Sequence, residues 1–260
     1  MTGNKDKVAI VTGAAKNIGR ATCDSLSKLG FNILVHANSD KEGAMETHEI
    51  VKKNGVNADI FIGDLTKEDT SRHLVDAGSK LGDISILVNN ASQREFNKFD
   101  DMSFDEWRFV LSINLDTLFH TCKAVIPEMK KNNWGRIINM ASVSVKEPLS
   151  YLALSNTIRS AVTSWGKTLS IESGKHNITV NNILTGFFNT ERLNQLNSEK
   201  SKKFNVSIEE VFDKMSEMVP LKRIGKTEEF GYLVAFLSSE YADYINGTNI
   251  PIDGGLLKSM

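Results

Sequence analysis

The amino-acid sequence predicts an α/β protein in which helices cover both faces of a parallel sheet. Two observations support this prediction. Short apolar runs alternate with helix-length segments in which apolar residues recur every three or four positions. Such alternation produces βαβ units, whose strands run parallel and are buried on both faces. The chain of 260 residues shows no repeat and no linker, so we expect a single domain over residues 1–260.

The elements follow one another in a regular order. Strands are expected at 8–11, 32–35, 60–62, 84–88, 137–140, 179–184 and 248–252. Helices are expected at 18–29, 41–54, 67–81, 104–131, 152–173 and 227–238. Gly30, Gly55, Gly82 and Gly135 each come just before a strand, where the end of a helix favours glycine. Residues 187–220 interrupt the order with two polar amphipathic pieces, and we expect them to form a lid over a substrate.

Charge and composition narrow the class of ligand. The chain has 31 Lys and Arg against 32 Asp and Glu, with no basic block, which disfavours nucleic acid and membrane surfaces as partners. A small-molecule substrate is expected instead. Cys23 and Cys122 form no CxxC pair, and the histidines lack ligand spacing, so no metal site is expected. The polar amino end and the absence of an apolar run of membrane-span length predict a cytoplasmic protein.

The turn after the first expected strand has the pattern of a phosphate-binding site. Residues 12–19 join this strand to a helix, whose first N–H groups and positive dipole end favour an anion. Gly13 permits a tight turn, Gly19 permits close packing, and Asn17 tolerates the left-handed backbone. We expect a nucleotide cofactor to bind at Gly13, Ala15, Lys16, Asn17, Ile18 and Gly19. The alternative is a tight turn without a ligand.

The end of the second expected strand bears on the choice of cofactor. An acidic residue there would bind the ribose 2′-hydroxyl and repel a 2′-phosphate. Asn38 and Ser39 occupy the position instead, with Lys16 in the preceding turn, which favours NADP(H). Asp40 follows closely, so NAD(H) is possible. Asp64, which precedes Leu65 after the third strand, is expected either to accept from the adenine amino group or to cap a helix.

A series of motifs in order resembles the short-chain dehydrogenase/reductase family, nearest to its 3-oxoacyl carrier-protein reductase type. They are Thr12-Gly13-xxx-Asn17-Ile18-Gly19, Asp64-Leu65, Asn89-Asn90-Ala91, Asn114, Ser142, Val180-Asn181, Gly186-xxx-Thr190, Arg223-Ile224-Gly225 and Asp253-Gly254-Gly255. The resemblance implies a doubly wound Rossmann sandwich of three layers with a parallel sheet of about seven strands. It also implies a homo-tetramer or homo-dimer, and further cofactor contacts at Asp64, Leu65, Asn90, Ala91, Gly186 and Thr190.

The same resemblance implies a catalytic set of Asn, Ser, Tyr and Lys. Asn114 and Ser142 match the first two. Counting from Ser142 forward and from Asn181 backward places the tyrosine position at Ser155 and the lysine position at Arg159, which would also bind the cofactor. The other register takes Tyr151, one helical turn upstream, as the tyrosine.

These two replacements predict unusual chemistry. A serine hydroxyl is a far weaker acid than a phenol, and an arginine fork is bulkier than an ammonium group. We expect an NADP(H)-dependent reductase of a ketone or 3-oxoacyl thioester with an atypical site of Asn114, Ser142, Ser155, Arg159 and Tyr151. The alternatives are a reductase of an activated C=C bond and a catalytically silent, cofactor-binding subunit that partners an active relative.

For several other residues near these motifs the sequence allows two interpretations. Phe187 and Phe188 are expected either in the core or on the apolar wall of a substrate pocket. Arg94, Glu95 and Lys146 are expected either to meet a polar substrate or to be solvated loop charges.

Overall fold

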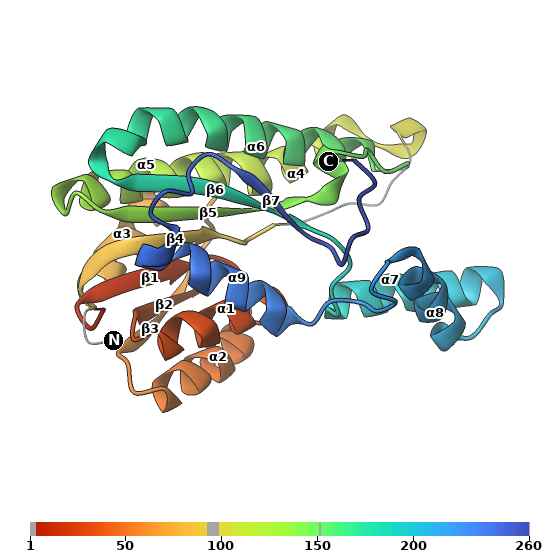
Figure 1. Ribbon diagram of the computed structural model, residues 1–260, viewed down its shortest axis with the longest axis horizontal. Coiled ribbons are helices and arrows are strands. Elements are labelled where there is room, and N and C mark those ends of the chain that lie inside the picture. The colour runs from red at the N-terminus through yellow and green to blue at the C-terminus, as the bar shows by residue number, and fades with distance from the viewer. Residues whose placement is uncertain (1–3, 93–98, 151, 260) are drawn as a thin grey trace.

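The structure, a computed structural model, describes residues 4–92, 99–150 and 152–259 (Figure 1). Its centre is a parallel sheet in the order β3-β2-β1-β4-β5-β6-β7. The strands are β1 (Lys7–Val11), β2 (Asn32–Ala37), β3 (Ala58–Ile62), β4 (Asp83–Asn89), β5 (Gly135–Ser142), β6 (Ile178–Thr185) and β7 (Asn249–Ile252). The order reverses between β1 and β4, and α/β sheets bind ligands at such a point.

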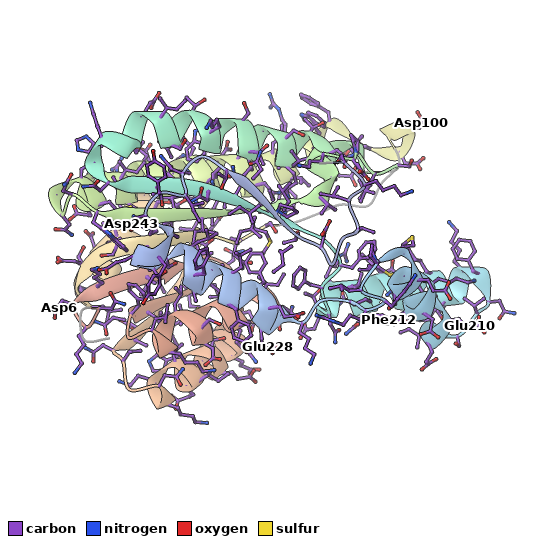
Figure 2. The ribbon with its side chains drawn as sticks, in the orientation of Figure 1. Asp6, Asp100, Glu210, Phe212, Glu228 and Asp243 are labelled. Carbon is purple, nitrogen blue, oxygen red and sulfur yellow. The ribbon has the colours of Figure 1, made fainter. Side chains whose placement is uncertain are left out.

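Helices cover the two faces of the sheet and confirm the predicted doubly wound three-layer arrangement (Figure 1). One face carries α1 (Asn17–Lys28), α2 (Lys41–Lys53) and α9 (Thr227–Leu237). The other carries α3 (Glu68–Ser79), α4 (Phe104–Leu111), α5 (Thr117–Lys131) and α6 (Ala153–Ser173). The two amphipathic pieces predicted within 187–220 are α7 (Glu191–Phe204) and α8 (Ile208–Met218). These two helices lie beyond the carboxyl ends of the strands, as Phe212 and Glu210 of α8 show (Figure 2).

Alternating side chains of the buried strands supply the two apolar layers. In β1, Ala9 and Val11 pack with α1 and α9, whereas Val8 and Ile10 pack on the opposite face, where α5 and α6 lie. All four residues have no exposed surface. The apolar runs that predicted strands are continuous because both faces of the sheet are covered.

The structure corrects the sequence prediction at two places. The helix predicted over 104–131 is continuous, but a π-helical turn, η2 (Ser112–Asp116), separates α4 from α5. Gly135 does not end a helix, because it is the first residue of β5. Asn133 takes the left-handed backbone after α5 instead, with φ of 48°. Gly30, Gly55 and Gly82 have positive φ, as a position after a helix favours.

Among the described residues, one helix is long and apolar enough to cross a membrane by length and composition alone. It is the continuous stretch Phe104–Lys131, with a mean hydropathy of 1.2 over its most apolar window. The core helix of a globular protein passes the same test, and this helix packs against β4, β5 and α3. Phe109 and Phe119 are about half exposed on its outer face.

A row of asparagines crosses four neighbouring strands. The Nδ2 of Asn89 donates to the Oδ1 of Asn139 over 2.9 Å, Asn139 donates to Asn182 over 3.0 Å, and Asn182 donates to Asn249 over 2.8 Å. The hydroxyl of Thr121 donates to the Oδ1 of Asn89 at the start of the row. All these hydrogen bonds run in one direction, so each amide polarises the next.

The tail after β7 runs past the carboxyl ends of the strands to the segment that follows β5. The carboxylate of Asp253 accepts from the backbone N–H of Leu257, 2.8 Å away. The carboxylate of Glu147 accepts from the N–H groups of Lys258 and Ser259 at 2.8 and 2.7 Å. Glu147 follows the short 3-10 helix η3 (Val143–Val145), so the tail lies close to the end of β5.

Candidate functional site

The turn after β1 is held by backbone contacts that exclude larger side chains. Gly13 has a φ of 63°, and a Cβ there would lie 2.9 Å from the Cα of Ala91. A Cβ at Gly19 would lie 2.3 Å from the carbonyl oxygen of Gly13. Both positions therefore require glycine, which agrees with the roles predicted for a tight turn and a closely packed helix.

His36 supports this turn from the end of β2. Its Nδ1 accepts from the N–H of Gly13 at 3.2 Å, and its Nε2 donates to the carbonyl oxygen of Gly63 at 2.9 Å. Burial lowers the pKa of His36 to about 4, so the ring is neutral and can hold both bonds. No motif in the sequence predicts this role for His36. Its position near the end of the second strand, beside the turn, was the one indication in the sequence that it could support the turn.

The start of α1 is open to an anion. Lys16 is the N-cap residue, no described side chain caps the helix, and its first turn carries no acidic residue. The unpaired N–H groups and the dipole of the helix therefore suit a phosphate. Ala15 and Ile18 are buried, so their backbone rather than their side chains would face such a ligand. The residues present fit the diphosphate of a dinucleotide.

Asn17 takes the left-handed backbone, with φ of 51°. Its Oδ1 accepts from the N–H of Glu191 at 3.2 Å, so its side chain extends toward α7. The ammonium of Lys16 lies 2.6 Å from the carboxylate of the same Glu191. The start of α7 is thus fastened to the turn by two contacts. The sequence around Glu191 carries no motif that predicts this role.

The residues expected at the adenosine end lie on the surface, apart from Leu65. Asn38 and Ser39 are exposed just after β2, and Asp40 caps α2 by accepting from the N–H of Gly43 at 2.9 Å. Asp64 accepts from the N–H and hydroxyl of Thr66. The interpretation of Asp64 as a helix cap is wrong, because the N-cap of α3 is Lys67. Leu65 is buried.

The end of β4 is joined to the turn through Thr12. The hydroxyl of Thr12 accepts from the N–H groups of Asn90 and Ala91, each at 3.0 Å. The Nδ2 of Asn90 in turn donates to the carbonyl oxygens of Thr12 and Gly13, at 2.9 and 2.8 Å. Asn90 and Ala91, expected near the cofactor, are therefore fixed beside the turn at the point where the strand order reverses.

A small cavity opens at this point and brings several expected site residues together. Its lining is Thr12, Asn89, Ala91, Asn114, Thr117, Leu118, Asn139, Met140, Arg159 and Val162. Asn114 lies in the π-helical turn, where its Nδ2 donates to the carbonyl oxygen of Val110 at 2.8 Å. Arg159 is buried, and its Nη1 donates to the carbonyl oxygen of Met140 at 2.7 Å. A fixed positive charge therefore borders the cavity.

The two serines lie at the ends of elements that pack against each other. Ser142 is the last residue of β5, and its Oγ accepts from the N–H of Ser144 at 3.2 Å. Ser155 lies on α6, which packs against η3, and one helical turn separates it from Arg159. Both serines are buried, and neither lines the cavity. Tyr151, Arg94 and Glu95 lie outside the described residues.

The remaining expected residues fall on the segment after β6. A Cβ at Gly186 would lie 2.7 Å from the Cα of Asp253, and Thr190 caps α7 by accepting from the N–H of Leu193 at 3.3 Å. Phe188 is a core residue, since it is buried with its ring 6.0 Å from that of Phe230. Phe187 is half-buried, and Lys146 is exposed.

Comparison with known proteins gives consistent matches along the chain. The family model described as enoyl-(acyl carrier protein) reductase matches residues 13–257. Glucose 1-dehydrogenase 2 of Bacillus subtilis is 32% identical over 256 residues, which cover 96% of this chain and 94% of that protein. The 3-oxoacyl-(acyl-carrier-protein) reductase FabG of Pseudomonas aeruginosa is 32% identical, with 97% and 98% covered. A crystal structure of an actinorhodin polyketide ketoreductase variant with NADPH superposes with a TM-score of 0.93 at 29% identity, and both chains are covered completely.

Proposed function

The chain belongs to the short-chain dehydrogenase/reductase family of oxidoreductases, and on that premise we propose that it reduces a carbonyl group with NADPH. The observation that carries the proposal is the cavity at the reversal of strand order, where Arg159 and Asn114 meet Ala91 beside an uncapped helix start. The similarity to FabG and to a ketoreductase solved with NADPH supports carbonyl reduction and this cofactor. The substrate is a ketone or a 3-oxoacyl thioester.

The proposed cofactor site combines the turn, Lys16 and the end of β2. Gly13, Gly19 and the first N–H groups of α1 hold the diphosphate, and Lys16 with Asn38 and Ser39 holds the 2′-phosphate. The exposure of Asn38 and Ser39 just after β2 supports this assignment, because both side chains are accessible to a ligand. Asp40 is committed to capping α2, which disfavours the NAD(H) alternative.

The proposed chemistry departs from the usual acid catalysis of the family. When bound, NADPH supplies a hydride to the carbonyl carbon. Ser142 and Ser155 donate hydrogen bonds to the carbonyl oxygen, and the guanidinium of Arg159 stabilises the negative charge that develops there. Arginine does not release its proton in proteins, and serine is a weak acid. The proton therefore comes from water or from Tyr151. In the C=C alternative the proton is delivered to carbon instead.

The segment 187–220 is proposed as the substrate lid of a single domain. Its helices α7 and α8 lie beyond the carboxyl ends of the strands (Figure 1), and Glu191 at the start of α7 contacts Lys16 and Asn17 of the turn. We further propose a homo-dimer or homo-tetramer. The exposed apolar residues Phe109 and Phe119 on the outer face of the 104–131 helix support association through that face.

Cofactor binding and turnover, measured separately, test the proposal. The purified protein is titrated with NADPH and NADH by cofactor fluorescence. Ketones, enones and 3-oxoacyl thioesters are then added while the absorbance of the reduced nicotinamide is followed. Tight NADPH binding with oxidation by a ketone or thioester supports the proposal, and oxidation by enones alone supports C=C reduction. Binding without any turnover would overturn the enzymatic proposal in favour of a silent, cofactor-binding subunit.

A further inference from the structure

Lys16 of the phosphate-binding turn forms an ion pair with Glu191 of helix α7. The Nζ of Lys16 lies 2.6 Å from the Oε2 of Glu191, and both side chains are about half exposed. The backbone N–H of the same Glu191 donates to the Oδ1 of Asn17 at 3.2 Å, which fixes the position of the carboxylate relative to the turn. A residue of α7 therefore places a negative charge directly on the turn that the cofactor would occupy.

The charged groups around Lys16 determine whether its ammonium can bind a further phosphate. The hydrogen bond from Lys16 to Glu191 raises the pKa of the lysine, and the charge of Asp40 acts in the same direction. Arg20, the other cation near the turn, donates to Glu46 at 2.7 Å and to the carbonyl oxygen of Ala15 at 2.6 Å. Arg20 is thus directed to α2, and Lys16 is the side chain placed to meet a further phosphate.

We propose that Glu191 is a specificity-determining residue for the cofactor, because its carboxylate competes with the 2′-phosphate of NADPH for the ammonium of Lys16. The inference rests on the proposed function. A 2′-phosphate brings nearly two negative charges, and it can bind the ammonium only by displacing the carboxylate that already contacts it. NADH carries a hydroxyl at the same position and meets no such competition. Glu191 therefore weakens the binding of NADPH but not of NADH, and it limits the preference for NADPH that Lys16 creates.

The variant Glu191→Gln removes the charge and retains the side-chain shape and the backbone N–H bond to Asn17. Exposed ion pairs contribute a few tenths to 1 kcal/mol, so we expect the Kd for NADPH to fall about threefold and that for NADH to change less than about 1.5-fold. High salt should reduce the difference, since the competition is between partly exposed charges. Kd values are measured by cofactor fluorescence and by calorimetry, without a substrate.

Glu46→Gln is the matched control. It also removes one exposed carboxylate that pairs with a cation beside the turn, since Glu46 contacts Arg20 at 2.7 Å. It should leave the ratio of the two Kd values unchanged. In a Lys16→Met background, which should weaken NADPH binding by itself, Glu191→Gln should also leave this ratio unchanged, because the shared cation is gone.

Several outcomes would overturn the inference. An equal change of both Kd values in Glu191→Gln would show general electrostatics rather than competition at the 2′-position. The same selectivity in Glu46→Gln, or its persistence without Lys16, would have the same meaning. Failure of the wild-type protein to bind either cofactor would instead contradict the proposed function, so the two failures are distinguishable.

Discussion

The guanidinium of Arg159 donates to the carbonyl oxygen of Met140 over 2.7 Å and so connects α6 to β5 two residues before Ser142. The arginine therefore acts on the geometry of the site as well as on its charge. An ammonium group on a shorter side chain offers no planar fork for this bond. Any attempt to restore the usual catalytic residues of the family must take this contact into account.

Restoring the phenol should increase turnover if the site is a modified reductase. We expect the double variant Ser155→Tyr, Arg159→Lys to raise kcat for a ketone by about 10²-fold, the usual contribution of general acid catalysis. Arg159→Lys alone should lower kcat, since it loses the bond to Met140 without gaining an acid. Steady-state rates with saturating NADPH test this, and equal rates in the double variant and the wild type would contradict it.

Ser142 should be essential for turnover. Replacing it with alanine removes a donor to the developing oxyanion, so we expect kcat to fall by about 10² to 10³-fold. The Kd for NADPH should stay within about twofold, because the proposed hydrogen bond from Ser142 is to the substrate and not to the cofactor. Ser144→Ala is the matched control, since only the backbone N–H of Ser144 contacts Ser142. Near-normal rates in Ser142→Ala would exclude the proposed role.

Stability should fall in acid through His36. Burial lowers the pKa of its imidazole to about 4 in the folded chain, against about 6.5 in the unfolded chain, so the unfolded chain binds more protons between these values. The free energy of unfolding should therefore decrease as pH falls from about 6.5 to about 4, by at most ~3 kcal/mol. Urea unfolding across this range should show a flatter profile for His36→Asn, whose Oδ1 can still accept from Gly13. The exposed His73→Asn should leave the profile unchanged.

Interrupting the asparagine row at its centre should lower the free energy of unfolding substantially. Asn139→Leu leaves the Oδ1 of Asn182 without its donor and leaves the Nδ2 of Asn89 with the Sγ of Cys122, a weak acceptor, so we expect a loss of about 2–5 kcal/mol in the free energy of unfolding. Asn249→Leu removes one partner at the exposed end of the row and should cost less than about 1.5 kcal/mol. Equal losses in denaturant unfolding would show that the row does not act as a connected array.

Association should depend on the outer face of the 104–131 helix. The double variant Phe109→Glu, Phe119→Glu places two charges on the face proposed to pair with a second copy, so we expect the molar mass in light scattering to fall to that of a smaller assembly. Phe204→Glu changes a phenylalanine on α7 that is more exposed than either of these, and it should leave the mass unchanged. An unchanged mass in the double variant would place the contact elsewhere.

The sequence predicted the elements that depend on local pattern. The apolar runs gave the strands, and glycine before Phe31 or Val56 marked the helix ends with positive φ. The left-handed residue after α5 is Asn133 rather than the expected Gly135, because asparagine also tolerates this backbone conformation. The π-helical turn at Asn114 was not predicted, because it spans only five residues between two longer α-helical segments.

Site residues could be predicted from the sequence only where their role depends on a single short segment. Gly13 and Gly19 act within the turn itself, and their spacing revealed them. The pairing of Lys16 with Glu191 joins residues that are far apart in the sequence, and the role of His36 depends on a strand lying beside the turn. Such contacts are set by topology, which a single sequence does not display.

The carboxyl tail imposes a practical condition on these experiments. Because Glu147 accepts from the N–H groups of Lys258 and Ser259, this part of the tail is held beside η3, which directly follows Ser142. An affinity tag at that end would pull on the strand terminus whose chemistry is being measured. Rates and binding constants should therefore be compared among proteins with an unmodified carboxyl end.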